Sequence, residues 1–168
     1  FRELWAQGAK YATWLNVELA ALVEMEAAGL APKGNAKQIT DKMRTEGITL
    51  DAARIDEIER TTKHDVIAFL THVEEKVGEP ARWLHLGLTS SDVLDTSFAI
   101  LLRTAAERLL VRTDALLGAL AARSREHMKT PIMGRSHGIS AEPTTFGVVL
   151  AGHYAEIARG RVRLEAAK

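Results

Sequence analysis

The sequence predicts an all-α protein, with a small helical N-terminal domain followed by the start of a bundle of long helices. Three observations predict this class. Apolar residues recur at three- and four-residue spacings along most of the chain, Gly and Pro interrupt the pattern at intervals, and one uninterrupted stretch is about three times as long as a mean globular helix. We expect residues 1–88 to form the N-terminal domain and residues 89–168 the first part of the bundle domain.

The first half of the chain predicts four helices. The first covers residues 4–28 and ends at Gly29, and its apolar stripe consists of Leu4, Ala9, Ala12, Leu15, Leu19, Leu22 and Val23. Two shorter helices follow, over residues 36–45 and from the N-cap candidate Asp51 to about residue 59. The fourth covers residues 66–77.

The second half predicts two longer helices around a break. Residues 89–92 are suited to capping a helix whose apolar face consists of Leu94, Phe98, Leu101, Ala105, Leu109, Leu116 and Leu120. Residues 131–143 are expected to be extended or irregular, with room for a short hairpin, and Thr144 starts the last helix. Both ends of the chain lie inside helical patterns without terminating residues, so we expect a fragment of a longer protein.

The composition favours a small-molecule partner. The chain has 22 Lys and Arg against 22 Asp and Glu, so its charge does not favour nucleic acid. Charges break the apolar runs well before the roughly 18 residues that a spanning helix needs, and no signal peptide pattern is present, so no membrane partner is expected. The absence of Cys excludes disulfides and thiolate catalysis and fits the cytoplasm.

His137 is the candidate catalytic residue. It lies in a polar, glycine-containing segment, residues 134–147, that separates two helical patterns. Loops held by rigid helices often carry function, and imidazole suits proton transfer near neutral pH. The surrounding polar residues suit an anionic ligand: Arg135, Ser136, Ser140, Thr144 and Thr145. The alternative is a loop histidine bonded to a backbone carbonyl.

Residues near two other expected helix starts are candidates for binding an anion. The Thr-Ser-Ser-Asp sequence at residues 89–92 supplies more polar side chains than one N-cap requires. A helix N-terminus also attracts carboxylates and phosphates. Capping alone is the alternative there, and a solvated helix start is the alternative for the Lys-His-Asp sequence at residues 63–65. The candidate binding residues are Lys63, His64, Asp65, His85, Thr89 and Ser90.

No metal or cofactor is expected. The other histidines, His72, His127 and His153, lie within or at the end of helical patterns and are interpreted as surface or packing residues, without the spacing of metal ligands. The sequence contains no glycine-rich phosphate loop, dinucleotide fingerprint or serine nucleophile motif. The functions that remain as candidates are ligand binding and acid–base catalysis.

Three motifs together resemble the aspartase/fumarase superfamily, and within it the adenylosuccinate lyase branch. They are Lys-His-Asp-Val-x-Ala-Phe at residues 63–69, Gly-Leu-Thr-Ser-Ser-Asp-Val-x-Asp-Thr at residues 87–96, and Gly-Arg-Ser-His-Gly-x-x-Ala-Glu-Pro-Thr-Thr-Phe-Gly at residues 134–147. They occur in the family's order and approximate spacing. Together they are specific, whereas the Thr-Ser-x-Asp element alone is shared with other superfamily members.

The resemblance implies a lyase of purine biosynthesis that removes fumarate from adenylosuccinate, giving AMP, and from the succinyl-carboxamide intermediate. It implies that His137 is the general acid that protonates the departing nitrogen. Thr89 and Ser90 match residues that grip the substrate, and Lys63, His64, Asp65 and His85 match further substrate contacts. The family is homotetrameric, with a central helical bundle and active sites built from three subunits.

The chain departs from the family in two ways. Ser136 and Ser140 stand where many members have Thr and a second His. An N-terminal Arg-Tyr element and the Ser-Ser-x-Met-Pro-x-Lys-x-Asn-Pro loop with the general base would lie outside this chain, so we expect the chain alone to be inactive.

Two other functions stay open. One is another superfamily enzyme, such as a carboxymuconate cycloisomerase or another fumarate-releasing lyase. The other is a helical assembly module without chemistry. An enzyme requires His137, His64 and Thr89 to approach one pocket, within or across subunits, whereas an assembly module would leave them scattered.

Overall fold

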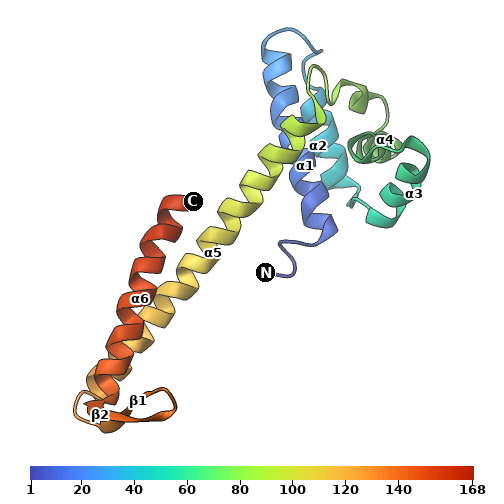
Figure 1. The fold of residues 1–168 in the computed structure, drawn as a ribbon. Helices are drawn as coiled ribbons and strands as arrows, with labels where there is room; N and C mark the ends of the chain where they lie inside the picture. The colour runs from blue at the N-terminus through green and yellow to red at the C-terminus, as the bar shows by residue number, and fades with distance from the viewer. The chain divides into compact units, whose positions relative to one another are not determined.

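The computed structural model describes residues 1–168, and the all-α prediction is confirmed apart from one two-stranded sheet (Figure 1). The chain divides into two compact units, Phe1–Leu101 and Leu102–Lys168. The expected domain boundary after residue 88 concerns the complete protein and stays a prediction. The elements are α1 (Gln7–Ala27), α2 (Asn35–Thr45), α3 (Ala52–Thr62), α4 (Asp65–Val77), the 3-10 helix η1 (Glu79–Trp83), α5 (Ser90–Glu126), β1 (Pro131–Ser136), β2 (Ile139–Thr145) and α6 (Phe146–Ala167).

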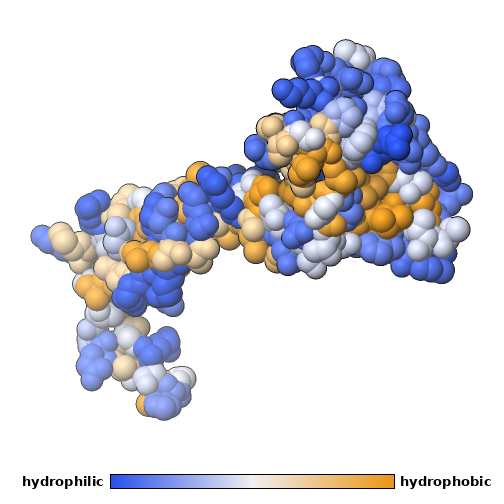
Figure 2. Space-filling model, turned by 90° about the horizontal axis from the view of Figure 1, so that it is seen from above, coloured by the Kyte–Doolittle hydropathy of each residue, from blue (hydrophilic) through white to orange (hydrophobic).

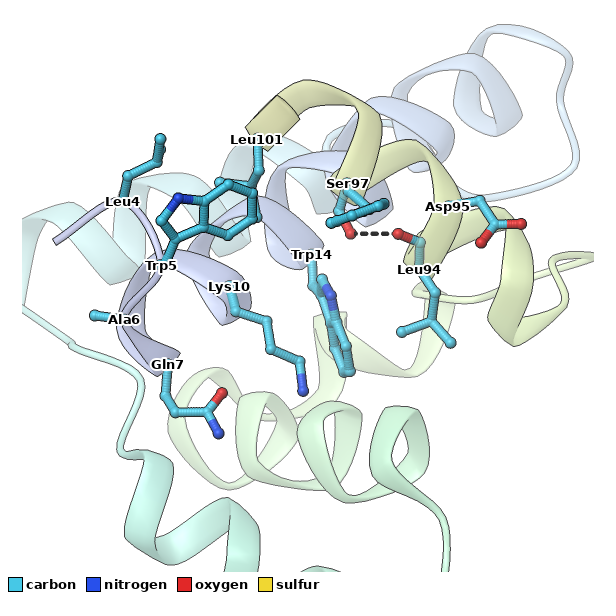
Figure 3. A pocket seen from close by; sticks show the side chains of 11 residues that line it. Leu4, Trp5, Ala6, Gln7, Lys10, Trp14, Leu94, Asp95, Ser97 and Leu101 are labelled. Carbon is cyan, nitrogen blue, oxygen red and sulfur yellow. Dashed lines mark hydrogen bonds between the residues drawn. The ribbon is translucent and has the colours of Figure 1, made fainter. Parts of the chain in front are cut away.

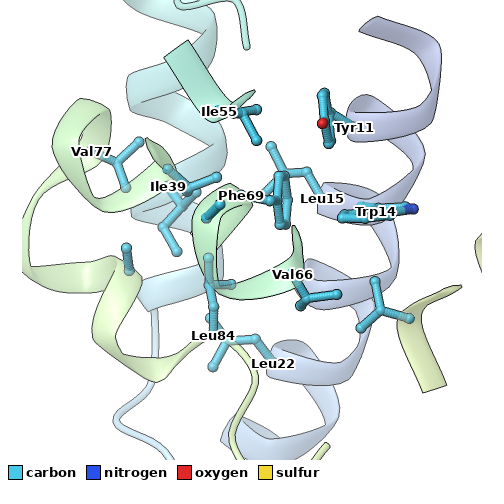
Figure 4. Close-up of a cluster of buried hydrophobic side chains, with 14 of the residues drawn as sticks. Tyr11, Trp14, Leu15, Leu22, Ile39, Ile55, Val66, Phe69, Val77 and Leu84 are labelled. Carbon is cyan, nitrogen blue, oxygen red and sulfur yellow. The ribbon is translucent and has the colours of Figure 1, made fainter. Parts of the chain in front are cut away.

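Three aromatic rings form the centre of the first unit. Phe69 of α4 stacks on Tyr11 of α1 with 5.9 Å between the ring centroids, and it meets Trp14 edge-on at 5.5 Å. All three side chains are buried, and aromatic pairs of this kind contribute roughly 0.5–1.5 kcal/mol beyond the burial of their area. This packing fixes α4 against α1. The rings lie among aliphatic side chains from several helices, including Leu15, Leu22, Ile39, Ile55 and Val66 (Figure 4).

The buried face of α1 differs from the predicted stripe. Ala12 and Val23 of that stripe are exposed, whereas Tyr11, Trp14 and Glu18 are buried. The prediction weighted small apolar residues equally with large ones. The aromatic side chains bury far more apolar area, so they determine which face of the helix turns inward.

Helix ends follow local sequence signals where these exist. The Asp51 carboxylate accepts the backbone N–H groups of Ala53 and Arg54 at 2.9 and 3.4 Å, which confirms it as the N-cap of α3. α3 then continues to Thr62, beyond its expected end near residue 59. It ends at Lys63, which adopts a left-handed conformation although the sequence has no glycine there to predict a helix end. The helix η1 was not predicted.

The second unit is an antiparallel pair of helices joined by a β-hairpin (Figure 1). α6 packs back along α5, where Arg161 donates to Asp114 with 3.0 Å between Nη2 and Oδ2 and lowers the pKa of that carboxyl. The hairpin begins where the extended stretch was predicted to begin and runs to Thr145, two residues beyond its predicted end. Thr145 caps α6 by accepting the N–H of Val148 at 3.4 Å, so the helix begins at Phe146, two residues after the expected start.

Both units leave large apolar side chains exposed. Figure 2 shows hydrophobic side chains gathered on one face of the first unit. The exposed large apolar residues of this unit include Trp5 and Phe98. The second unit exposes Val111, Leu116 and Val162. Large exposed apolar patches are typical of interaction sites and ligand-binding grooves. None of the helices combines the length and apolar content that crossing a membrane requires.

His72 of α4 is completely buried and supports the start of α3. Its Nε2 accepts the N–H of Asp51 at 3.1 Å, so the neutral ring carries its proton on Nδ1. Burial lowers the pKa of His72, and the positive charge of Lys76 lowers it further. The Glu75 carboxylate, 3.6 Å from Nδ1, opposes these effects without overcoming them. His72 is thus a packing residue, which is one of the two roles that its place in the helical pattern left open.

The first unit should therefore lose stability in mild acid. As the pH falls through about 6.5, the unfolded chain binds a proton at His72 before the folded chain does, so the free energy of unfolding decreases by at most about 1.4 kcal/mol per pH unit from this group. Urea denaturation at a series of pH values measures the slope. In His72→Gln the side-chain carbonyl can still accept the Asp51 N–H, and the slope should flatten; an unchanged slope would assign the acid sensitivity to other groups.

Candidate functional site

The N-termini of α4 and α5 are joined by a contact between His64 and Ser90. His64 is the N-cap of α4, and its Nδ1 accepts the N–H of Ile67 at 3.4 Å. A neutral ring whose Nδ1 accepts must carry its proton on Nε2. Nε2 lies 3.3 Å from the Ser90 hydroxyl oxygen, in the first turn of α5, and donates to it. Two of the predicted binding motifs therefore meet in space.

The joined helix starts are suited to an anion. Each N-terminus presents backbone N–H groups without intrahelical partners and the positive end of the helix dipole. Asp65 accepts the N–H of Val66 and Asp92 accepts the N–H of Thr89, each at 2.8 Å. Capping therefore accounts for these two carboxylates. The hydroxyls of Thr89 and Ser90 remain the groups best placed to bind a carboxylate or phosphate.

His85 is held by a residue that the sequence analysis missed. Glu18 of α1 is completely buried, and its two oxygens lie 2.7 Å from the backbone nitrogen and 2.6 Å from Nδ1 of His85. The signal in the sequence is a carboxylate between Leu15 and Leu22 on an otherwise apolar face, because a carboxylate is rarely buried without a partner.

Three non-glycine residues have a left-handed backbone, and all three are predicted site residues. They are Lys63, His85 and His137, with φ of 53°, 62° and 51°. This conformation costs an ordinary residue roughly 1–2 kcal/mol, and residues held in it cluster at ligand and active sites. Gly or Asn would fit with less strain. The coincidence favours a functional reason for Lys and His at these positions.

His137 lies at the tip of the β-hairpin. It and Gly138 form the two-residue loop between Ser136 and Ile139, and both have positive φ, as in a type I′ turn. The His137 side chain is exposed. His137 belongs to the second unit, whereas the predicted binding residues belong to the first.

Other residues of the same segment serve the fold. A Cβ on Gly134 would lie 2.7 Å from the Glu142 carbonyl oxygen, at the point where the register between the strands shifts. A Cβ on Gly147 would lie 2.5 Å from the Ser124 carbonyl oxygen, where α6 meets α5. Both positions require glycine.

A cavity of about 390 Å³ in the first unit contains none of the predicted site residues (Figure 3). Its walls are mainly apolar, with Trp5, Trp14 and Phe98 among them. The Ser97 hydroxyl at its edge already donates to the Leu94 carbonyl at 2.9 Å, and Lys10 lies over the Trp14 ring. With few free polar groups converging on it, this cavity is a weaker candidate than the helix junction.

Comparison with known proteins yields matches over nearly the whole chain. The sequence matches the lyase family over residues 2–168. It is 43% identical over 162 residues to adenylosuccinate lyase from Synechocystis sp., a match that covers 96% of this chain and 36% of that protein. The chain thus spans little more than a third of the length of such curated relatives.

Two solved structures share the fold. Fumarate lyase from Mesorhizobium sp. BNC1 superposes with a TM-score of 0.88 at 27% identity, covering 98% of this chain and 38% of that one. The 3-carboxy-cis,cis-muconate lactonizing enzyme from Pseudomonas putida superposes with a TM-score of 0.87, at the same identity and coverage.

Substitutions of His137 should separate the demands of the turn from those of chemistry. His137→Asn suits a type I′ turn and should leave the free energy of unfolding unchanged or slightly higher. His137→Val should lower it by about 1–2 kcal/mol, because a β-branched residue is strained at positive φ. Urea denaturation of the two variants tests this. Equal stabilities would contradict the left-handed conformation of residue 137.

Proposed function

We propose, because this chain belongs to the lyase family, that the whole protein releases fumarate from adenylosuccinate, leaving AMP, and from the succinyl-carboxamide intermediate of purine synthesis. The resemblance inferred from the three motifs is confirmed by the family match and the 43% identity to an adenylosuccinate lyase. That identity, over 96% of the chain, is the observation that carries the proposal.

The proposed reaction is a β-elimination in which His137 is the general acid. A base removes a proton from the substrate carbon, the C–H electrons form the double bond of fumarate, and the C–N bond breaks. His137 donates a proton to the departing nitrogen. The base would come from a part of the protein outside this chain.

The proposed substrate carries several negative groups, which agrees with the chemistry of the helix junction. The hydroxyls of Thr89 and Ser90 would hold one of these groups at the N-terminus of α5. His64 adjoins them through its 3.3 Å contact with Ser90. Lys63, Asp65 and His85 complete the proposed binding set.

A cycloisomerase is the second candidate, because the Pseudomonas putida lactonizing enzyme shares the fold at a TM-score of 0.87. Its 27% identity is well below the 43% identity to the adenylosuccinate lyase. Assaying the full-length protein with adenylosuccinate and with 3-carboxy-cis,cis-muconate decides between them. Conversion of only the muconate would refute the purine assignment, and inactivity on both would favour an assembly module.

We further propose that the protein is a cytoplasmic homotetramer whose active sites combine residues of several subunits. The exposed apolar side chains of α5 and α6, such as Val111 and Val162, support a large contact with other subunits. Light scattering of the full-length protein measures the mass.

Replacing His137 by Asn in the full-length enzyme should lower kcat by about 10²–10⁴-fold and change KM much less. A general acid acts on the transition state, and Asn keeps the turn while removing the titratable group. A steady-state assay that follows fumarate release by absorbance measures both constants. A decrease of kcat below about tenfold would exclude His137 as the acid.

Replacing Thr89 and Ser90 together by Ala should raise KM, because the hydroxyls that hold an anionic group are lost. If they serve only to cap α5, the double variant should lose about 1 kcal/mol of stability with unchanged kinetics. Thermal melting and steady-state kinetics of the same preparation distinguish these results.

A further inference from the structure

Glu18 occupies a position where an apolar side chain is expected. It lies on the buried face of α1 between Leu15 and Leu22, and none of its surface is exposed. Burying a carboxylate is unfavourable unless hydrogen bonds and charge compensate, and Leu or Met would fill this space without that cost. The packing of the core alone does not account for Glu18.

Both oxygens of Glu18 are bound to a single residue. Oε2 accepts the backbone N–H of His85 at 2.7 Å, and Oε1 lies 2.6 Å from Nδ1 of the same residue. Because a carboxylate only accepts hydrogen bonds, Nδ1 must carry a proton. The backbone bond also holds His85 in its left-handed conformation. One side chain therefore fixes both the backbone and the ring of His85.

The other ring nitrogen of His85 is left to meet a ligand. The His85 side chain is 18% exposed while its Nδ1 faces the buried carboxylate, so Nε2 is the ring atom free to bind. The His85 carbonyl accepts the N–H of Leu88 at 3.2 Å, and this turn leads directly into Thr89. His85 thus adjoins the start of α5 along the chain.

We propose that Glu18 is a positioning residue of the binding site, which keeps the proton of His85 on Nδ1 and presents Nε2 to the substrate. The proposal rests on the proposed function, in which His85 contacts the substrate. Carboxylate partners of this kind fix the tautomer and orientation of functional histidines, and at metal-binding histidines replacing them typically costs about ten- to a hundredfold in affinity or activity. We expect an effect of the same size at His85.

The first test is Glu18→Gln in the full-length protein. The Gln carbonyl can still accept the His85 backbone N–H, but its NH₂ group faces Nδ1 and can only donate, so the ring proton should move to Nε2. KM should rise about ten- to a hundredfold while kcat changes less. The ¹⁵N shifts of histidine-labelled protein in magic-angle-spinning NMR report which ring nitrogen carries the proton.

Glu26→Gln is the matched control. Glu26 lies on the same helix and accepts the backbone N–H groups of Gly34 and Ala36 at 2.9 and 2.8 Å, at the start of α2. The same substitution there should change the melting temperature without changing KM or the His85 signals. Adding Glu18→Gln to a His85→Ala background should raise KM no further, because Glu18 acts through His85.

Three results would overturn the proposal: a His85 ring proton on Nε2 in the wild-type protein, an unchanged KM in Glu18→Gln, or an effect of Glu18→Gln that persists in His85→Ala. The first needs no variant, so it decides the matter even if Glu18→Gln does not fold. A wild-type protein that releases no fumarate would instead refute the proposed function, and the NMR measurement would still show whether Glu18 sets the tautomer.

Discussion

Helix α1 is the element to which both parts of the first unit's candidate site are attached. The aromatic side chains of α1 hold α4 through Phe69, and His64 is the N-cap of α4. Its buried carboxylate Glu18 holds the loop of His85. The hydrophobic burial of these rings is non-directional, whereas the carboxylate sets the direction of a backbone N–H and a ring. A displacement of α1 would therefore move both parts of the site together.

The segment of residues 134–147 combines the requirements of the fold with those of the proposed chemistry. Gly134 and Gly147 are needed because no Cβ fits at either position, and Thr145 caps α6. His137 is different, since the turn would accept Asn or Gly with less strain. Positions where a sequence does not follow the local preference of the backbone are where function is expected. The strain at His137 thus adds a physical argument to the motif.

The features that the sequence predicted well depend on neighbouring residues, and those that it missed depend on distant ones. The Asp51 cap, the short hairpin and the long helix α5 follow from signals within a few residues. The buried face of α1 depends on contacts with Phe69, which is far along the chain, and its prediction was partly wrong. Glu18 could not be paired with His85, because no spacing rule links residues that only the tertiary fold brings together. The roles of the site residues stay predictions.

The exposure of His137 limits how the proposed reaction can proceed. A general acid works best where water is excluded and the donor is held against the leaving group. His137 lies in solvent at the tip of its loop, and neither strand of the hairpin has a buried residue. A two-residue turn is too short to fold over its own histidine, so the enclosure must come from other surfaces. The same unit exposes large apolar side chains, such as Val111 and Val162. In the proposed homotetramer, a subunit contact over α5 and α6 would therefore also provide the enclosure that His137 requires.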